Sequence, residues 1–330
     1  MTDEAKKAPA TAINWGDVLA RNGAFIALVL LILFNLAWTP NFLSWQTLNV
    51  NLTQVAGIVI VAVGMTLVIA TGGIDLSVGS LMAIAGALAP LIFLGQIVPM
   101  PSPLLGVALA IVVPILAAGV FGLFNGFLVT QFRIQPIIAT LVLFIAGRGI
   151  AQVVTNGNLQ PFRNPKFQIV GLGRVAGIPA QVILMLIIVA LAAWMIRRTL
   201  LGRQILAVGG NERAARLAGV PVNRVKLIVY FISGLCAGLA GLVVIAINSS
   251  SDANLVGQGM ELDAIAAVAV GGTLLAGGRA YVGGTLVGAL IIQLVRYTLL
   301  ANNVPDAAAM MVKAGLIVLA VWLQGGLKRR

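Results

Sequence analysis

The run NVNLTQVAGIVIVAVGMTLVIA, residues 49–70, decides the fold class of this chain. It has no charged side chain, and a helix of about 20 apolar residues is long enough to cross the roughly 30 Å hydrocarbon core of a bilayer. Similar runs recur along all 330 residues, of which 60% are hydrophobic and only 9% are charged. The sequence therefore predicts an all-α, polytopic membrane helix bundle without a separate soluble domain.

The hydrophobic runs predict about ten membrane-spanning helices. The expected spans are residues 24–38, 49–70, 76–94, 104–129, 137–155, 180–196, 227–247, 264–276, 283–300 and 307–323. The five tryptophans, at positions 15, 38, 45, 194 and 322, lie at or near the ends of these spans, where amphipathic rings favour the headgroup level. The chain thus divides into an N-terminal tail (1–23), a transmembrane domain (24–323) with a polar loop (197–226), and a basic C-terminal tail (324–330).

The positive charges predict the orientation of these helices. With the N-terminus in the cytoplasm, 15 of the 21 Lys and Arg residues lie in the cytoplasm. Three more, Arg163, Lys166 and Arg174, then lie outside, and Arg148, Arg296 and Lys313 lie within spans. Because cytoplasmic loops carry an excess of Lys and Arg, we expect both termini and the polar loop to be cytoplasmic. The net charge of +12 has the same origin and does not indicate nucleic-acid binding.

The polar loop contains a complete signal for a short helix. Residues 209–221 read GGNERAARLAGVP, in which Asn211 is the expected N-cap, Glu212 lies in the positive first turn and Gly219 ends the helix. A helix of about two turns is too short to be stable alone in water. We therefore expect a surface outside this chain to support it.

Two glycine-rich segments resemble each other. Residues 64–79 (GMTLVIATGGIDLSVG) are similar to residues 271–283 (GGTLLAGGRAYVG) once a gap is allowed. Both place paired glycines, Gly72-Gly73 and Gly277-Gly278, at an expected helix break, and interrupted helices in matching halves often flank a transport path. Coincidence in a glycine-rich chain is the alternative. Asp75 is expected to be the N-cap of the next helix at the inner membrane surface, with a transport role as the alternative.

Polar residues within the spans have two interpretations. Arg148 either faces other helices and water or reaches the outer interface. Gln54, Asn125 and Gln293 either line a hydrophilic path or hydrogen-bond to neighbouring helices. For Glu261 and Asp263, solvation at the outer interface or contact with an external partner is expected, because residues two apart on a helix face different directions. Glycines spaced by four, such as Gly122 with Gly126, Gly234 with Gly238 and Gly284 with Gly288, predict close helix packing.

Several functional classes are not indicated. Histidine is absent, the nine acidic residues are scattered, and the single cysteine, Cys236, cannot form a disulfide within the chain. No catalytic or metal site is therefore predicted. The chain also lacks the Gly-x-x-x-x-Gly-Lys-Ser/Thr motif that cradles nucleotide phosphates. Any ATP must be bound by a partner, and no cofactor is expected in this chain.

Three segments, in this order, resemble the ribose-type permeases of bacterial ATP-binding cassette sugar importers: residues 63–80, 209–219 and 261–268. The resemblance extends from about residue 44 to residue 323. Residues 138–141 (IATL), 146–152 (AGRGIAQ) and 251–254 (SDAN) are most similar to the galactofuranose-type branch, whereas residues 209–212 are equally similar to the ribose-type branch. The sugar is therefore left open.

The resemblance implies a non-enzymatic permease subunit in the bacterial inner membrane. Its partners would be a second permease chain, identical or related, two cytoplasmic ATPase subunits that bind ATP and magnesium, and a periplasmic sugar-binding protein. The ATPase-coupling residues would be Asn211, Glu212, Arg213, Ala214, Ala215 and Gly219. A path that opens alternately to each side would be lined by Gln54, Asn125, Arg148 and Gln293, near the helix-break residues Gly72, Gly73, Asp75, Gly277 and Gly278.

Two other functions remain as alternatives. An ion-coupled secondary carrier of a small polar solute needs buried ion sites, and no carboxylate is predicted at mid-membrane, although backbone carbonyls at broken helices can bind sodium. A membrane scaffold or lipid-handling subunit fits the composition but does not explain the capped helix in the polar loop.

Overall fold

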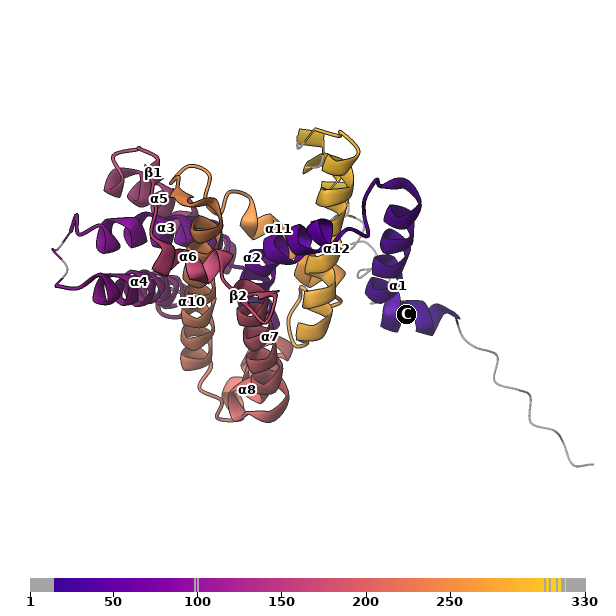
Figure 1. The fold of residues 1–330 in the computed structure, drawn as a ribbon. Coiled ribbons are helices and arrows are strands. Elements are labelled where there is room, and N and C mark those ends of the chain that lie inside the picture. Colours follow the sequence, from indigo (N-terminus) through magenta and orange to yellow (C-terminus); the bar gives the residue numbers. More distant parts are fainter. Residues whose placement is uncertain are drawn as a thin grey trace, which may run out of the picture.

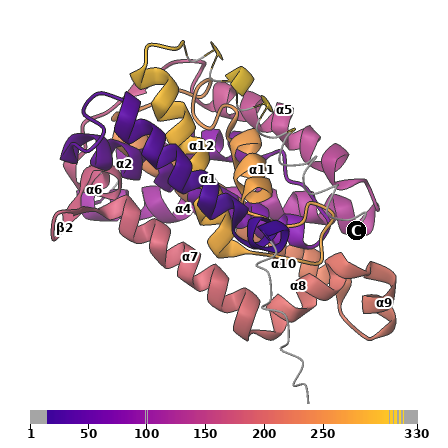
Figure 2. The same ribbon diagram turned by 90° about the vertical axis from the view of Figure 1, so that its right-hand side faces the viewer.

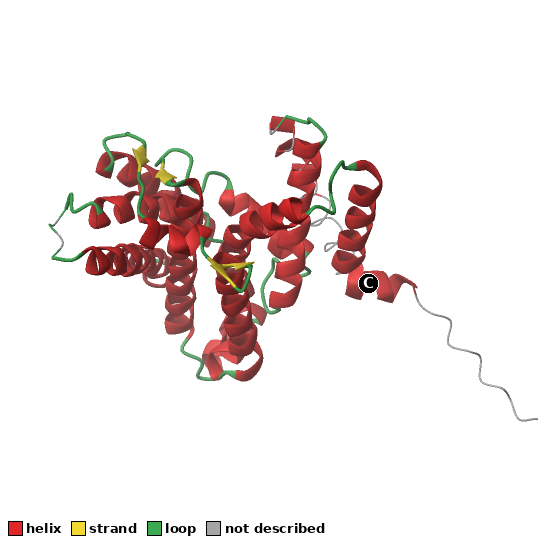
Figure 3. Ribbon diagram, viewed as in Figure 1, coloured by secondary structure: helices red, strands yellow, loops and turns green. Residues whose placement is uncertain are grey.

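The computed structural model describes residues 15–318, apart from residues 98, 100, 306, 309, 313, 316 and 317. The fold is helical, with only four two-residue strands among these residues (Figures 1 and 3). In chain order the elements are α1 (Trp15–Trp38), α2 (Trp45–Ala70), α3 (Val78–Phe93), α4 (Pro103–Gln131), α5 (Pro136–Val154), β1 (Gln160–Pro161), α6 (Pro165–Leu172), β2 (Arg174–Val175), β3 (Ile178–Pro179), α7 (Ala180–Arg198), α8 (Leu200–Gly210), α9 (Glu212–Leu217), α10 (Val222–Asn248), β4 (Ser250–Ser251), α11 (Met260–Val270) and α12 (Val282–Ala301).

Six of these helices are long and apolar enough to cross a membrane: α2, α4, α5, α7, α10 and α12. Helix α3 and residues 23–38 of α1 are apolar but shorter. Helix α11 has 11 residues, which at 1.5 Å per residue gives about 16 Å. The expected span at 264–276 is therefore wrong, because the helix stops at Val270. The expected span at 307–323 lies largely outside the described residues, so the number of ten spans stays a prediction.

Local signals explain where several helices begin. The hydroxyl of Ser44 accepts a hydrogen bond from the Thr47 amide at the start of α2, and Ser102 caps α4 in the same way. Thr199 caps α8 through the amide of Gly202. Proline occupies the first turn of α4, α5 and α6, where its missing N–H group costs nothing.

Helix α2 forms the centre of the bundle. The segment from Val55 to Ala70 is apolar on every face, and all of its residues are buried. In Figure 1, helices α3, α4, α5 and α10 form one group beside α2, whereas α12 and α1 lie on its other side. Because α2 contacts α7, α10, α11 and α12, its apolar surface is covered by protein rather than lipid.

The four-residue glycine spacings do mark close helix contacts. A side-chain carbon on Gly122 of α4 would collide with the carbonyl oxygen of Tyr230 on α10. A side-chain carbon on Gly288 of α12 would likewise collide with the carbonyl oxygen of Ala267 on α11. The predicted close packing is confirmed at both contacts, where small residues let two backbones touch.

The two ends of the bundle differ. Helices α8 and α9 project at one end, hereafter the α9 end (Figure 2). At the same end, the end of α4, residues 133–136, helix α9 and the first two turns of α10 line a polar cavity of about 390 Å³. The opposite end of the bundle is hereafter the strand end. Helices α5 and α10 end there, and the strands that follow them, β1 and β4, pair antiparallel.

The polar loop (197–226) contains more structure than the sequence predicted. Besides α9 it holds α8, an 11-residue helix that includes Gly209 and Gly210. The sequence pattern predicted α9 and made no prediction of α8. Tertiary contacts, described below, require a residue without a side chain at Gly209.

Candidate functional site

Helix α9 is built as its sequence predicts. The Asn211 side chain accepts a hydrogen bond from the Ala214 amide at 3.0 Å, which confirms the N-cap. At the other end Gly219 adopts φ +81°, a left-handed conformation that favours glycine. The Gly219 amide donates to the Arg216 carbonyl at 3.1 Å and ends the helix.

Glu212 fixes α9 to the second turn of α10. Its carboxylate binds the Lys226 ammonium at 2.7 Å and the Arg216 guanidinium at 3.3 Å. The hydrogen bond from Lys226 lowers the pKa of the Glu212 carboxyl below its ordinary value. Since both partners lie within the same loop, Glu212 serves to hold the loop together as well as to complement the positive end of the helix.

The outer surface of α9 is left open. Of the six predicted coupling residues only Ala215 is buried, while Asn211, Glu212, Arg213, Ala214 and Gly219 are exposed. Leu217, which the sequence analysis did not single out, has 90% of its surface exposed. A single exposed apolar side chain is common on protein surfaces, so the open face of α9 as a whole, and not Leu217 alone, is the feature that fits a partner. A leucine directly after Arg216, in a helix that is otherwise charged or made of alanine, was the signal for it in the sequence.

Helix α8 joins α9 to both helix breaks. A side-chain carbon on Gly209 would collide with the Ala70 carbonyl oxygen at the end of α2 and lie 2.5 Å from the Gly278 amide nitrogen. The Gly278 amide donates a hydrogen bond to that same carbonyl at 3.0 Å. A side-chain carbon on Gly277 would lie 2.9 Å from both the Gly209 oxygen and the Gly72 nitrogen. We call this contact of Gly72, Gly209, Gly277 and Gly278 the glycine junction.

The predicted helix-break residues all lie outside helices, but the internal match is different from the one expected. Gly64 lies inside α2, so residues 64–70 are helical whereas residues 271–276 are not. The structurally equivalent glycines are Gly72 and Gly272, with φ +82° and +84°. In both breaks the next amide bonds five residues back, from Gly73 to Val68 at 3.1 Å and from Thr273 to Val268 at 3.2 Å.

These two turns are the same helix-stop motif, in which a left-handed glycine lets the following amides bond back to the last helical carbonyls. The alignment of Gly72-Gly73 with Gly277-Gly278 is therefore corrected to Gly72 with Gly272. The pair Gly277-Gly278 lies later in the second break, where it meets Gly72 in the glycine junction.

Asp75 is not the N-cap of α3. The helix begins after Ser77, and Asp75 is completely buried. One carboxylate oxygen accepts from the Ser77 amide at 3.0 Å and the Ser77 hydroxyl at 2.7 Å, and the other accepts from the Ser233 hydroxyl of α10 at 2.8 Å. Two of these three bonds are local, from Ser77, and the third joins the carboxylate to α10. They also hold a carboxylate inside the bundle, where none was predicted from the sequence.

Asn125 extends this network to α4. Its amide nitrogen donates to the Ser77 hydroxyl at 2.8 Å, and the residue is fully buried. The Asn125 side-chain oxygen and the Tyr230 hydroxyl have no hydrogen-bond partner among the described residues. Hydrogen bonds therefore hold the first helix break to α4 and α10. The Asn125 oxygen and the Tyr230 hydroxyl could each form one more hydrogen bond.

Gln54 and Gln293 link α2 to α12. The Gln293 amide nitrogen donates to the Gln54 oxygen at 2.8 Å, with Gln293 buried and Gln54 exposed. The pair therefore forms a hydrogen bond between neighbouring helices, which is one of the two roles predicted for these residues. The exposed side of Gln54 borders a cavity of about 500 Å³ together with Asn49, Thr53 and Arg174.

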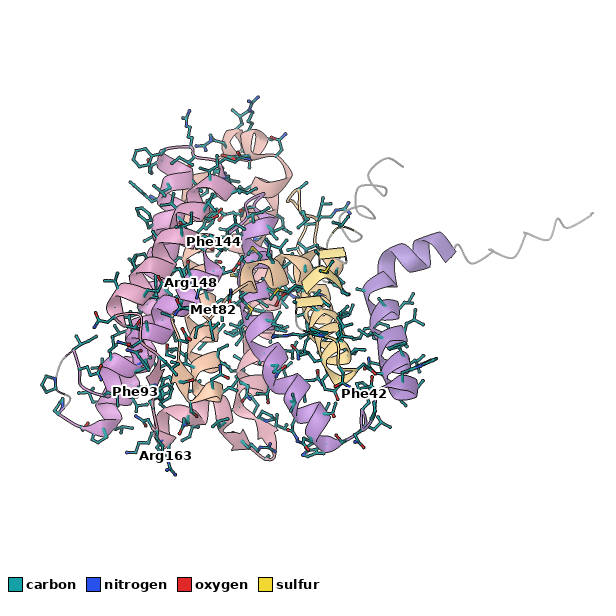
Figure 4. The ribbon with its side chains drawn as sticks, turned by 90° about the horizontal axis from the view of Figure 1, so that it is seen from above. Phe42, Met82, Phe93, Phe144, Arg148 and Arg163 are labelled. Atoms are coloured by element: carbon teal, nitrogen blue, oxygen red, sulfur yellow. The ribbon has the colours of Figure 1, made fainter. Side chains whose placement is uncertain are left out.

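Arg148, labelled in Figure 4, faces protein rather than extending to the interface. One guanidinium nitrogen donates to the carbonyls of Ala253 at 2.8 Å and Val256 at 2.6 Å, in the loop between β4 and α11. Glu261, at the start of α11, is buried, so its expected solvation at the outer interface is wrong. The loop brings the start of α11 inside the bundle, which the hydropathy pattern cannot reveal.

Comparison with known proteins identifies the family. Residues 48–321 match the family described as "Branched-chain amino acid transport system / permease component". The chain belongs to this permease family. It is 43% identical to the ribose import permease protein of Escherichia coli K12 over 311 residues, which cover 92% of this chain and 93% of that protein.

Other relatives of this permease have names that include further sugars. The galactofuranose transporter permease protein of Escherichia coli K12 is 39% identical, covering 91% of this chain and 88% of that protein. The L-arabinose ABC transporter permease protein of Azospirillum brasilense is 35% identical, covering 96% and 91%. No solved structure matches the chain. Together with its long apolar helices, this relationship makes the chain a multi-pass membrane permease.

Proposed function

We propose that this permease is the membrane subunit of an ATP-binding cassette importer for a monosaccharide. The observation that carries the proposal is the connection from the exposed helix α9 through Gly209 to both helix breaks. A surface helix joined by backbone contacts to the interrupted helices is suited to pass a partner's motion into the bundle. The relatives, named for ribose, galactofuranose and L-arabinose, favour a sugar over the branched-chain amino acids of the family description.

The proposed complex needs three kinds of partner. A cytoplasmic ATPase, which holds ATP and magnesium, contacts α9 through Arg213, Ala214 and Leu217. A second permease chain, identical or related, completes the path, and a periplasmic sugar-binding protein meets the strand end. The chain then lies in the bacterial inner membrane with both termini in the cytoplasm, and hydrolysis occurs in the ATPase because this chain has no nucleotide-binding motif.

In this mechanism the permease changes access and does no chemistry. Closure of the ATPase pair moves α9 and α8, and the glycine junction passes the displacement to the two breaks. Those breaks connect α2 to α3 and α11 to α12, so the helices on either side shift against each other. Arg148, Asn125, Gln54 and Gln293 are the residues proposed to meet the sugar or to move with the path.

One observation favours the ion-coupled carrier as a second candidate. Asp75 is a fully buried carboxylate inside a membrane bundle, and such groups often bind protons or ions. Its three hydrogen bonds from Ser77 and Ser233 fit a structural role equally, and an ion-coupled carrier does not account for the open face of α9.

The deciding experiment measures uptake in vesicles that contain the assembled complex. We expect ATP inside the compartment facing α9 to drive uptake of at least one sugar from a panel of pentoses and hexoses, and not of leucine or isoleucine. Proton and sodium gradients without ATP should drive none. Uptake that follows an ion gradient and ignores ATP would overturn the proposal.

A further inference from the structure

Two segments far apart in sequence meet at the half of α5 nearer the strand end. The Gln152 amide nitrogen donates to the Asn254 side-chain oxygen at 2.7 Å, and Arg148 binds the adjacent backbone carbonyls. Asp252 accepts from the Asn254 amide at 2.8 Å and from its side-chain nitrogen at 3.1 Å. We call Arg148, Gln152, Asp252 and Asn254 the Arg148 cluster. These are the segments that carry the resemblance to the galactofuranose-type branch, 146–152 and 251–254.

The cluster is open on one side. Asn254 is exposed, and Arg148, Gln152 and Asp252 are half-buried. The same face of α5 continues toward the α9 end with Ile138, Leu141 and Ile145, which are all exposed. Arg148 lies six residues before the last residue of α5, about 9 Å along the helix. A guanidinium and a carboxylate are costly against lipid, so the open side of the cluster must meet water or another protein surface.

Close contacts fix the Arg148 cluster to α3, one of the helices that shift in the proposed mechanism. Gly257, in the loop that holds Asp252 and Asn254, packs against the backbone of Gly79 so closely that a side-chain carbon would collide with the Gly79 oxygen. Gly79 lies in the first turn of α3, directly after the first helix break. The buried Glu261 lies against the same glycine, attracts Arg148, and has one carboxylate oxygen without a hydrogen-bond partner among the described residues.

The chemistry of the cluster suits a polyhydroxylated solute. Sugar hydroxyls both donate and accept hydrogen bonds; here a guanidinium donates, a carboxylate accepts, and two amides do both. The bond between Gln152 and Asn254 can be exchanged for bonds to a hydroxyl pair without leaving either amide unsatisfied. We propose that the Arg148 cluster is a contact site for the sugar during its passage. This inference rests on the proposed function and adds a selectivity site within the permease itself.

The test uses Gln152→Leu and Asn254→Leu, which remove hydrogen bonding at similar volume. The matched control is Asn158→Leu, at an exposed position in the turn after α5. We expect each cluster variant to lower sugar uptake by the assembled complex about three- to tenfold, as the loss of one or two hydrogen bonds predicts, and to change the preference between competing sugars. ATPase stimulation by the sugar-binding protein should remain, which a folding defect would not allow.

A labelling experiment identifies what occupies the exposed side. Asn254→Cys in a Cys236→Ser background should react with a membrane-impermeant maleimide, and saturating transported sugar together with the binding protein and trapped ATPase should slow the reaction. A labelling rate that is the same with and without the sugar would overturn the proposal.

The outcomes separate the two proposals. If the wild-type complex takes up no sugar with ATP, the proposed function is wrong and the cluster inference falls with it. If the wild type transports a sugar but Gln152→Leu and Asn254→Leu behave like Asn158→Leu in rate and preference, the cluster is not a sugar contact, while the proposed function stands.

Discussion

Asp75 shows at the residue scale how a local sequence signal can mislead. An acid that follows glycines and precedes an apolar run is a typical N-cap. Here the Ser77 amide and hydroxyl and the Ser233 hydroxyl instead enclose the carboxylate. Ser233 lies 158 residues away in the chain, so only the assembled bundle places its hydroxyl at this position.

Replacing Asp75 distinguishes hydrogen bonding from charge. Asp75→Ala leaves two buried hydroxyls and the Ser77 amide without their acceptor and should lower the free energy of unfolding by on the order of 2 kcal/mol or more. Asp75→Asn keeps an acceptor for Ser77, and the Ser233 hydroxyl can turn to accept from the new amide, so its stability should stay close to the wild type. Thermal unfolding of the purified protein in detergent measures both, with Asn158→Leu as the surface control.

Transport by the same variants gives the second readout. If Asp75 holds the helix break by hydrogen bonds, the asparagine variant should retain most ATP-driven uptake. Full stability of Asp75→Asn with complete loss of uptake would show that the carboxyl charge or its proton is required, which would favour the ion-coupled carrier.

The glycine junction is the central feature at the element scale. Three segments from different parts of the chain meet there through backbone atoms alone: the end of α2, the end of α8 and the second helix break. Side chains at such a contact can change rotamer and absorb a displacement, whereas touching backbones cannot. The junction can therefore transmit movement of α8 to both breaks with little loss.

Adjacent glycines in α8 provide a matched test of the junction. Gly209→Ala places a methyl group against the Ala70 carbonyl, whereas Gly210→Ala meets no atom within 4 Å. Overpacking of this kind costs about 1–3 kcal/mol, and we expect it to separate α8 from the breaks. The Gly209 variant should hydrolyse ATP with much less sugar taken up per ATP, while the Gly210 variant should match the wild type.

The measurement is the ratio of sugar transported to ATP hydrolysed in vesicles that contain the complex. Equal ratios for Gly209→Ala and Gly210→Ala would contradict a role of the junction in coupling. A loss of assembled complex in the Gly209 variant alone would show that the contact serves stability rather than coupling.

At the scale of the whole molecule, the two ends carry different charge and structure. The α9 end combines Arg133 of the α4–α5 turn with Arg216 and Lys226 around one polar cavity. The strand end presents Arg174 beside the polar first turns of α2. This asymmetry supports the proposed orientation, with the α9 end in the cytoplasm.

Cysteine accessibility tests that orientation. In a Cys236→Ser background, Arg174→Cys should react with an impermeant maleimide added to intact spheroplasts, and Arg213→Cys should react only after the membrane is opened. Both positions are exposed, so access to the reagent and not burial decides the result. The reverse pattern would place α9 outside and exclude its contact with a cytoplasmic ATPase.

The sequence by itself determined the features that depend on composition and on near neighbours. Long uncharged runs require a membrane environment, and the caps of α9 need only hydrogen bonds between residues three to five positions apart. The close packing at glycines spaced by four was also readable, because that spacing places small residues on one helix face.

The tertiary structure alone decided the features that depend on distant partners. The contacts of Gly209 in helix α8, the early end of α11, the enclosure of Asp75 and the burial of Glu261 all involve segments that local patterns treat separately. Arg148 binds a carbonyl 105 residues away, so neither segment alone reveals the cluster that they form. Short-range hydrogen bonds and hydropathy act before the bundle assembles, whereas these contacts exist only once the helices have packed.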